Sequence, residues 1–209
     1  MSRKTGANQG DRPVAIAYYT GDYAAQAGRL RTSLVRHGFE HFLQRVPDQG
    51  SWLANTGLKP RFVQACLERF QDRALLYLDA DAVLVRQPKL LETYREPGTC
   101  DIAIHFRPRQ ERKPELMSGT IYLANTPGCR RVVAEWVEEQ TQHPDVWDQR
   151  NLQAVIERLG DAVRLKLLPA SYCYIIGRTR SGEPPVIAHR LSSKARRKRR
   201  RTPVAKDPQ

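Results

Sequence analysis

The chain has 209 residues, 40% of them hydrophobic, which is enough for one domain with a buried core and short tails. The formal net charge is +13, but residues 190–209 hold nine basic residues and one acidic residue, so this end carries +8 and residues 1–189 carry +5. Four widely spaced cysteines without a C-x-x-C pair argue against a zinc knuckle and against a dense disulfide framework.

The first residues, MSRKTGANQGDRP, lack the apolar stretch of a signal peptide, and no run approaches the roughly 20 apolar residues that span a bilayer. We therefore expect a cytoplasmic protein with reduced, buried thiols. The sequence predicts no transmembrane segment, so any membrane contact would be peripheral.

The first half of the chain alternates between strand and helix patterns. After a polar leader at residues 1–12, the predicted elements are a buried strand at 14–20, a helix at 22–37 ending near Gly38, a short element at 41–46, turns at 48–60, a helix at 61–70 and a buried strand at 75–85.

The second half continues the alternation. The predicted elements are strands at 101–106 and 119–124, helices at 127–142 and 148–159, and closing strands at 164–168 and 186–189. The two middle strands are separated by a charged loop that contains Arg107, Arg109, Arg112 and Lys113. The pattern favours an α/β fold in which helices flank a mostly parallel central sheet, with ligands at the carboxyl ends of the strands.

Two aspartates interrupt the apolar segment LLYLDADAVLV at residues 75–85. Carboxylates are disfavoured in a buried strand, and residues i and i+2 of an extended chain point to the same side. Asp79 and Asp81 therefore predict a site for Mg²⁺ or Mn²⁺, cations that proteins often share with substrate phosphates. The alternative is structural: Asp79 caps a turn and Asp81 faces solvent.

Four motifs, in order along the chain, resemble nucleotide-sugar glycosyltransferases of the GT-A fold, of the retaining kind that includes glycogenin and bacterial lipopolysaccharide galactosyltransferases. They are the D-x-D segment at 75–85, MSGTIYLANT at 117–126, WDQRNLQAVI at 147–156 and VIAHRLSSK at 186–194. The resemblance implies a single GT-A-like domain at 13–194. The basic residues 195–209 that follow are too polar to fold alone, so we expect a disordered tail there. Three departures are Met117, where asparagine is common, Ser192, where the family usually has a glycine, and Lys194, five instead of six residues after His189.

The resemblance also implies functional residues. Asp79, Asp81 and His189 would bind Mn²⁺ or Mg²⁺, which bridges the two phosphates of a nucleotide-diphosphate sugar, with a UDP-sugar as the expected donor. Asp148 and Gln149 would act at the sugar as the catalytic pair. The residues expected to bind the donor are Tyr18, Tyr19, Thr20, Lys59, Ala80, Ser118, Gly119 and Lys194.

Each of these residues also has a structural interpretation. His189 follows an apolar strand and is compatible with a packed or surface histidine, and Asp148 is placed to be a helix N-cap. Tyr18, Tyr19 and Thr20 are compatible with ordinary strand residues, and for Lys59 we expect solvent rather than a phosphate as its partner.

The family is thought to transfer its sugar with retention, so the acceptor would approach from the face on which the diphosphate leaves, and a departing phosphate oxygen would take its proton. Inversion would instead require a general base, for which Asp101, Glu115 and Asp148 are candidates.

The segment KARRKRRR at 194–201 predicts contact with a polyanion through counterion release. DNA that carries a 5-hydroxymethylpyrimidine, as in phage-type DNA modification, is one acceptor, and Arg107, Arg109, Arg196, Arg197 and Arg199 would bind it. The alternatives are a cell-envelope saccharide or lipopolysaccharide acceptor at an anionic membrane, or a solvated run that aids solubility. A function of another class is non-catalytic nucleic-acid binding on a degenerate transferase fold.

Overall fold

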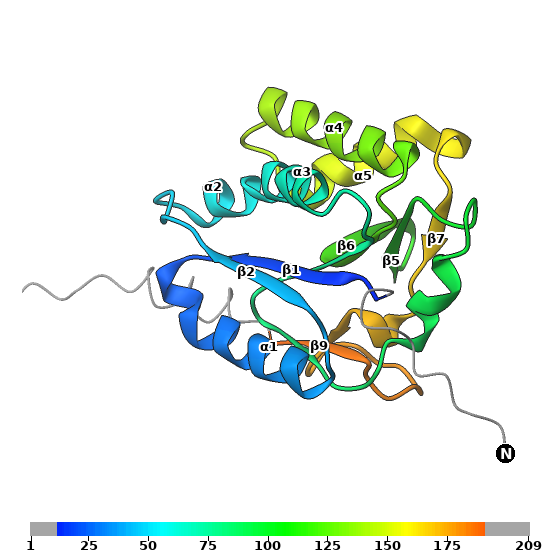
Figure 1. The fold of residues 1–209 in the computed structure, drawn as a ribbon. Helices are drawn as coiled ribbons and strands as arrows, with labels where there is room; N and C mark the ends of the chain where they lie inside the picture. The colour runs from blue at the N-terminus through cyan, green and yellow to red at the C-terminus, as the bar shows by residue number, and fades with distance from the viewer. Residues whose placement is uncertain (1–11, 191–209) are drawn as a thin grey trace, which may run out of the picture.

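A six-stranded sheet runs through the computed structural model, which describes residues 12–190 (Figure 1). Its strands lie in the order β2 (His41–Arg45), β1 (Val14–Tyr19), β3 (Leu75–Leu78), β6 (Arg112–Leu123), β5 (Ile102–Arg109) and β7 (Leu165–Leu167). Within this sheet, β6 runs antiparallel to both of its neighbours and the other pairs are parallel. The predicted α/β fold with a mostly parallel central sheet is confirmed.

Helices cover one face of the sheet and a mixed layer covers the other (Figure 1). The helices α2 (Trp52–Gly57), α3 (Lys59–Arg69), α4 (Pro127–Gln142) and α5 (Asp148–Leu159) lie on one side, and α1 (Ala24–Arg36) lies on the other with a small second sheet. Successive strand residues serve opposite faces: Leu75 and Tyr77 pack toward α3 and α4, while Leu76 and Leu78 pack toward α1. Burial on both faces explains why the strand sequences are apolar throughout.

The predicted strand at 75–85 is wrong as one element. It divides into β3 and β4 (Ala82–Leu84), and β4 belongs to the second sheet with β9 (Ile187–His189) and β8 (Tyr174–Ile175). A turn separates them, in which the Ala82 N–H donates to the Asp79 carbonyl at 2.9 Å. The two aspartates leave the buried sheet at this turn, which avoids the cost of carboxylates inside a strand.

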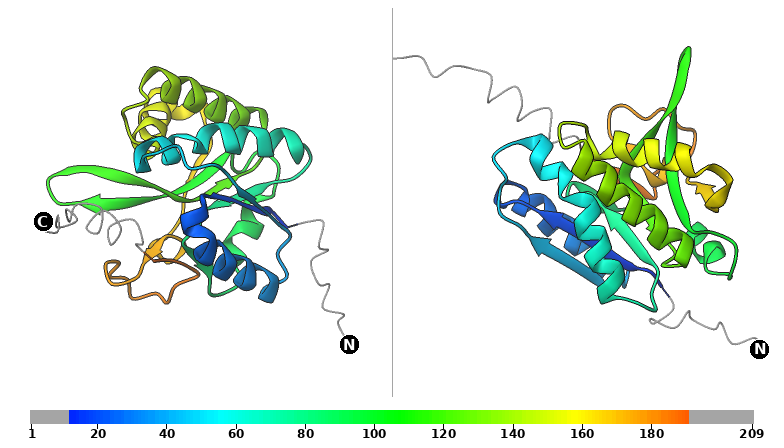
Figure 2. Two further views of the ribbon diagram at one scale, coloured as in Figure 1. Left: turned by 90° about the vertical axis from the view of Figure 1, so that its left-hand side faces the viewer. Right: turned by 90° about the horizontal axis from the view of Figure 1, so that it is seen from above.

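The charged segment after residue 106 is also not a loop. It is the outer half of a hairpin in which β5 pairs with β6, with Arg107 opposite Glu115 and Arg109 opposite Arg112. This hairpin projects from the body of the protein (Figure 2), and residues 108–114 at its outer end are exposed, so they need no apolar alternation.

Both helices predicted in the second half have the predicted bounds. The Thr126 hydroxyl caps α4 by accepting from the Cys129 N–H at 3.1 Å, and Pro127 occupies its first turn. In the first half, a 3₁₀ turn precedes α1, so this helix begins later than predicted; α3 begins earlier, and α2 lies in a segment predicted as turns. The closing strands are β7, at the edge of the central sheet, and β9, in the second sheet.

Cys66, Cys100, Cys129 and Cys173 are buried and form no disulfide in the described chain. Within residues 12–190, no helix combines the length and apolarity that crossing a bilayer requires.

Candidate active site

A cavity of about 690 Å³ opens where β1 and β3 end, at the carboxyl edge of the central sheet. This is the position at which open α/β sheets bind ligands. The predicted site residues that line it are Tyr18, Tyr19, Thr20, Lys59, Asp79, Ala80, Asp81, Arg107, Arg109, Ser118, Gly119, Asp148, Gln149 and His189. Lys194, Arg196, Arg197 and Arg199 lie outside the described residues.

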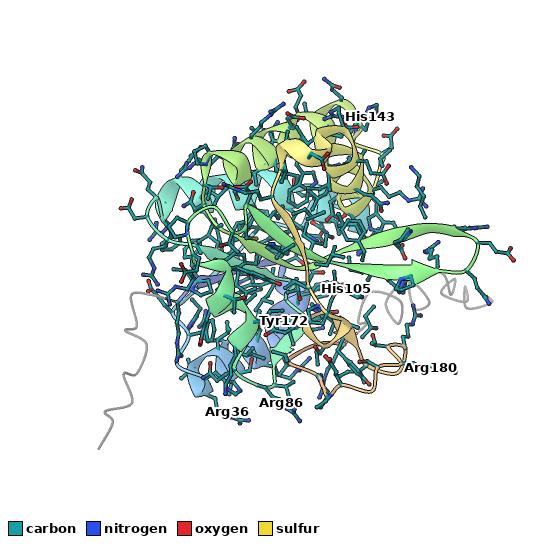
Figure 3. The ribbon with its side chains drawn as sticks, turned by 90° about the vertical axis from the view of Figure 1, so that its right-hand side faces the viewer. Arg36, Arg86, His105, His143, Tyr172 and Arg180 are labelled. Carbon is teal, nitrogen blue, oxygen red and sulfur yellow. The ribbon has the colours of Figure 1, made fainter. Side chains whose placement is uncertain are left out.

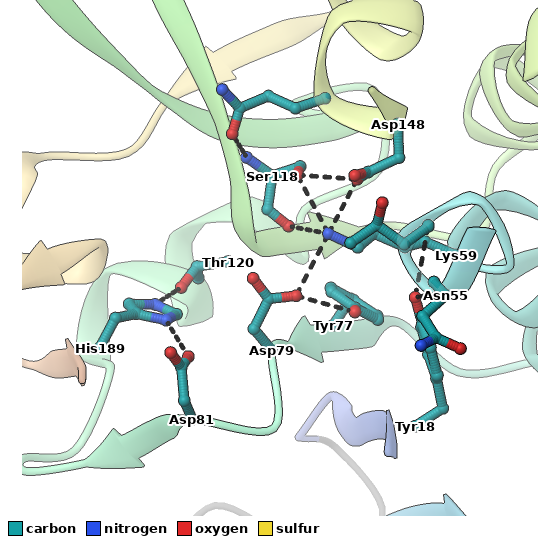
Figure 4. Close-up of polar contacts among 12 residues, drawn as sticks. Tyr18, Asn55, Lys59, Tyr77, Asp79, Asp81, Ser118, Thr120, Asp148 and His189 are labelled. Carbon is teal, nitrogen blue, oxygen red and sulfur yellow. Dashed lines mark hydrogen bonds and ion pairs between the residues drawn. The ribbon is translucent and has the colours of Figure 1, made fainter. Parts of the chain in front are cut away.

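Asp79, Asp81 and His189 form one cluster, in which each residue offers a ligand atom within 4.8 Å of the others (Figure 4). The turn between β3 and β4 presents both carboxylates, and the pairing of β4 with β9 sets His189 opposite Ala82. The side chains are 40%, 16% and 6% exposed, respectively. Two hard oxygen ligands and one imidazole suit Mn²⁺ or Mg²⁺, with the histidine favouring Mn²⁺.

The His189 ring is fixed on both sides. Its Nε2 lies 2.8 Å from the buried Thr120 hydroxyl, and its Nδ1 lies 3.5 Å from Asp81 Oδ1. If the ring loses its Nδ1 proton to bind a metal, the N–H at Nε2 that donates to Thr120 leaves the Nδ1 lone pair directed at the carboxylates, which is how metal-ligating histidines are usually held. Burial alone lowers the pKa of His189, but the Cys173 thiol and the Asp81 carboxylate outweigh it and raise the pKa to about 10.

Gly119 keeps space open within this cluster. A Cβ at this position would lie 3.1 Å from His189 Cε1 and 3.2 Å from Asp79 Oδ2. The Gly119 carbonyl also accepts from the Asp79 N–H at 2.9 Å, which fixes the turn against β6. The residues present therefore fit a divalent cation: their ligand atoms face one small space that an added methyl group would crowd.

Lys59 is buried, which contradicts the expectation that it points to solvent. Its ammonium lies 3.2 Å from Asp79 Oδ1 and 2.9 Å from Asp148 Oδ2, and it donates to Ser118 Oγ at 3.0 Å. Burial lowers the pKa of Lys59, but Asp148 and Asp79 outweigh it, so the net shift is upward and the amine stays charged. Lys59 thus links the D-x-D turn to the start of α5.

Asp148 is not the N-cap of α5, because Trp147 holds that position and the Asp148 side chain points into the cavity (Figure 4). Its Oδ2 accepts from the Ser118 hydroxyl at 3.0 Å in addition to Lys59. The Trp136 indole donates to the Asp148 carbonyl at 2.9 Å and anchors this turn. The Gln149 side-chain oxygen accepts from the Ser118 N–H at 3.3 Å, and this hydrogen bond connects the first turn of α5 to β6.

Tyr18, Tyr19 and Thr20 line the cavity where β1 ends. The Tyr18 hydroxyl donates to the Asn55 carbonyl at 2.8 Å, and its ring packs on Phe62 at a centroid distance of 5.2 Å. Burial, partly offset by Lys59, raises the pKa of Tyr18. Tyr18 is thus both a core residue and part of the cavity wall.

Of the three bases considered for inversion, two line the cavity. Asp101 does not: it directly precedes β5, and Arg164 pairs with it there at 2.6 Å. Glu115 lies on the wall and pairs with Arg107 and, at 2.7 Å, with Arg109. Burial raises the pKa of Glu115, but the hydrogen bonds from these arginines lower the pKa by more than burial raises it, so the net shift is downward. Glu115 and Asp148 are both ion-paired.

Several residues of the wall had no role in the sequence analysis. Tyr77 donates to Asp79 Oδ1 at 2.9 Å, and Trp52 packs edge-on against Trp147 at 5.2 Å. Thr120 and Cys173 contact His189. Tyr77 and Thr120 lie two residues from Asp79 and Ser118 on alternating strand positions, a signal that could have found them. The tryptophan pair joins segments far apart in sequence and gives no such signal.

Comparison with known proteins gave matches at the level of structure. No protein-family model matches the sequence, and no curated protein matches it. A glycosyltransferase involved in glycosylation of the major capsid of PBCV-1 aligns with a TM-score of 0.67 at 12% identity, over 90% of this chain and 98% of its own. GlyE of Streptococcus pneumoniae TIGR4 aligns at 0.60 and 16% identity, over 87% of this chain, which spans only 55% of GlyE.

The galactosyltransferase LgtC, solved with donor and acceptor sugar analogues, aligns at 0.55 and 12% identity, over 85% of this chain and 87% of its own. The TM-scores show a common architecture, while the low identities carry no more than the fold. The chain therefore has the fold of solved glycosyltransferases that include LgtC, in agreement with the resemblance of its motifs to the GT-A group.

Proposed function

We propose that the protein is a metal-dependent glycosyltransferase that moves a sugar from a nucleotide-diphosphate sugar to an acceptor hydroxyl. The observation that carries the proposal is the Asp79, Asp81 and His189 cluster, next to the buried Lys59–Asp148 ion pair in one cavity. On this fold, the cluster would hold a cation that binds the diphosphate of the donor, and the ion pair would form a polar subsite for the sugar beside it.

When bound, Mn²⁺ or Mg²⁺ would act as a Lewis acid that stabilises charge developing on the leaving diphosphate. The residues of the chain bind and orient the donor. Tyr19 and Thr20 form the wall for the nucleotide, and Ala80 lies in the turn beside the phosphates. Ser118 and Gly119 face the sugar, between Lys59 and the metal ligands.

Retention of configuration fits the state of Asp148. Its Oδ2 is bound by Lys59 and Ser118, which suits a group that orients the sugar and supports it electrostatically, with Gln149, better than a free nucleophile. In this scheme the acceptor hydroxyl approaches from the face on which the diphosphate leaves, and a phosphate oxygen of the donor takes its proton. Asp148 and Gln149 are the residues proposed to act at the reacting sugar.

We propose a polyanionic acceptor, and DNA that carries a 5-hydroxymethylpyrimidine is the specific candidate. Arg107 and Arg109 support it, because both line the cavity and share a single carboxylate, Glu115, so the pair keeps a net positive charge. They lie on the hairpin that projects from the body of the protein (Figure 3). The run at 194–201 begins five residues after His189 in the sequence. A cell-envelope acceptor at an anionic membrane is the second candidate. Non-catalytic nucleic-acid binding is disfavoured, since paired carboxylates without a metal repel phosphate.

The test is release of nucleoside diphosphate from a panel of nucleotide sugars with Mn²⁺, with and without 5-hydroxymethylated duplex DNA, followed by mass spectrometry of the digested nucleosides. We expect Asp79→Asn and Asp81→Asn to abolish release, while Asp161→Asn, an exposed carboxylate outside the cavity, retains it. A sugar mass on the modified nucleoside would establish the DNA acceptor. Full turnover by both site variants would refute the metal-dependent mechanism.

Removal of residues 195–209 tests whether donor binding and acceptor binding depend on different parts of the chain. The truncated chain should keep donor hydrolysis and lose efficiency only with a polyanionic acceptor. Equal loss of both activities would contradict the separate roles proposed for the cavity and the basic segment.

A further inference from the structure

The positive charges that line the cavity are mostly neutralised by neighbours. Lys59 binds Asp79 and Asp148, and the two hairpin arginines bind Glu115. Two further arginines line the same cavity, Arg150 and Arg178, and the side chains of both are exposed and form no ion pair or hydrogen bond with any other residue of 12–190. Neither guanidinium group is neutralised by a neighbour among these residues, so the position of each relative to the candidate metal ligands decides which one can reach a diphosphate.

Arg178 belongs to the metal end of the cavity. It lies in the turn that follows β8, and β8 pairs with β9 so that Ile175 is opposite His189. The Ile176 N–H donates to the His189 carbonyl at 3.0 Å, which ties the turn to the candidate metal ligand. The Thr179 hydroxyl accepts from the Ile175 N–H at 2.8 Å and closes the turn.

Arg150 belongs to the other end. It follows Gln149 in the first turn of α5, and the Gln149 amide reaches Glu115 of the hairpin at 3.4 Å. Figure 4 shows the order of the groups between the two ends, with His189 and Asp81 on one side, Asp79 and Lys59 in the middle, and Asp148 on the other. A diphosphate bound at the candidate metal ligands would therefore lie nearer to Arg178 than to Arg150.

Charge balance favours a further cation for the diphosphate. The carboxylates of Asp79 and Asp81 would neutralise a divalent ion held between them, which would leave the charge of a bound diphosphate uncompensated. Lys59 is 3% exposed and already committed to two carboxylates. Arginine suits the task because its planar guanidinium binds phosphate oxygens through two parallel hydrogen bonds.

We infer that Arg178 is a binding residue for the diphosphate of the donor, through contacts that persist on the leaving group after transfer. This inference rests on the proposed glycosyltransferase function and specifies its phosphate subsite. It adds the turn after β8 to the donor-binding residues that the motif resemblance implied.

The experiment measures the affinity of inorganic pyrophosphate and of a panel of nucleoside diphosphates by calorimetry, in the presence of Mn²⁺. Pyrophosphate makes the result independent of the nucleotide base. The matched control is Arg180→Ala, since Arg180 is exposed on the same loop and does not line the cavity (Figure 3). Arg150→Ala tests the other end.

We expect Arg178→Ala to weaken pyrophosphate and nucleoside diphosphates by about 10- to 100-fold, the worth of a charged hydrogen bond to phosphate. Arg180→Ala and Arg150→Ala should bind pyrophosphate like the wild type, Arg178→Lys should recover part of the loss, and Mn²⁺ alone should bind Arg178→Ala normally.

The possible results distinguish failure of the proposed function from failure of the role assigned to Arg178. If the wild type binds neither pyrophosphate nor any nucleoside diphosphate, the proposed function itself fails. If the wild type binds them and Arg178→Ala matches Arg180→Ala, the role of Arg178 is overturned. A weaker affinity of Arg178→Ala for Mn²⁺ alone would also overturn it, because the arginine would then act through the metal ligands.

Discussion

Replacement of Lys59 by methionine should destabilise the protein strongly, because it removes the cation that the cavity carboxylates share. Lys59 and Asp148 are 3% and 2% exposed, and their charged atoms are 2.9 Å apart. Methionine keeps the volume of the side chain but leaves the buried Asp148 carboxylate without its ion-pair partner. Removing one partner of a buried pair costs about 3–5 kcal/mol. Asp79 adds little to this cost, because it is 40% exposed and solvent screens its charge.

The expected loss is a large part of the total stability of a domain, which is about 5–15 kcal/mol. Urea unfolding of the wild type, Lys59→Met, Asp148→Asn and the double variant forms a double-mutant cycle. We expect the double variant to be less destabilised than the sum of the single variants by about 2 kcal/mol or more, because Asp148→Asn removes the uncompensated charge. Additive single effects, or a loss below about 1 kcal/mol for Lys59→Met, would refute the buried ion pair.

The pH dependence of this loss follows from the raised pKa of Lys59, where Asp148 and Asp79 outweigh burial. Because the folded pKa lies above the unfolded value, the stabilisation is fully present below about pH 10.4 and is lost as pH rises through the folded pKa. The difference in unfolding free energy between the wild type and Lys59→Met should therefore be the same at about pH 6 and pH 9. A difference that disappears between these two pH values would contradict the assignment.

Three further substitutions test the site. Gly119→Ala should weaken Mn²⁺ binding by about tenfold or more, because its Cβ would lie 3.1 Å from His189, whereas Gly28→Ala, with nothing within 4 Å, should bind normally in the same titration. Thr120→Val should also lower Mn²⁺ affinity, by about 10- to 100-fold, because it frees the His189 ring; unchanged affinity would show that the hydroxyl does not orient it. Burial raises the pKa of Glu115, but its two arginine partners lower the pKa by more, so the folded pKa lies below the unfolded value. The stabilisation from this pairing is therefore present above about pH 4.3 and is lost as pH falls through the folded pKa. Thermal unfolding of Glu115→Gln between about pH 5 and pH 3 should thus show less acid sensitivity than the wild type, and identical curves would contradict the pairing.

The sequence by itself determined the elements whose pattern is local. The bounds of α4 and α5 follow from apolar positions at helical spacing and from Thr126 and Pro127 at the start of α4. The apolar runs of β1 and β3 indicated strands buried on both faces, and the four ordered motifs indicated the fold. The spacing of Asp79 and Asp81 also indicated that the two carboxylates lie close together, as they do in the cluster with His189.

The tertiary structure decided how these elements meet. It ended β3 at Leu78 and moved Ala82–Leu84 to a second sheet, where strand register brings His189 to the two aspartates. It also buried Lys59, although a lysine before a proline reads as a solvated residue. The partners of Lys59 come from a turn, a strand and a helix that are far apart in sequence. Local patterns record backbone propensity, whereas burial of a charge depends on whether the fold brings opposite charges and hydrogen-bond partners to it.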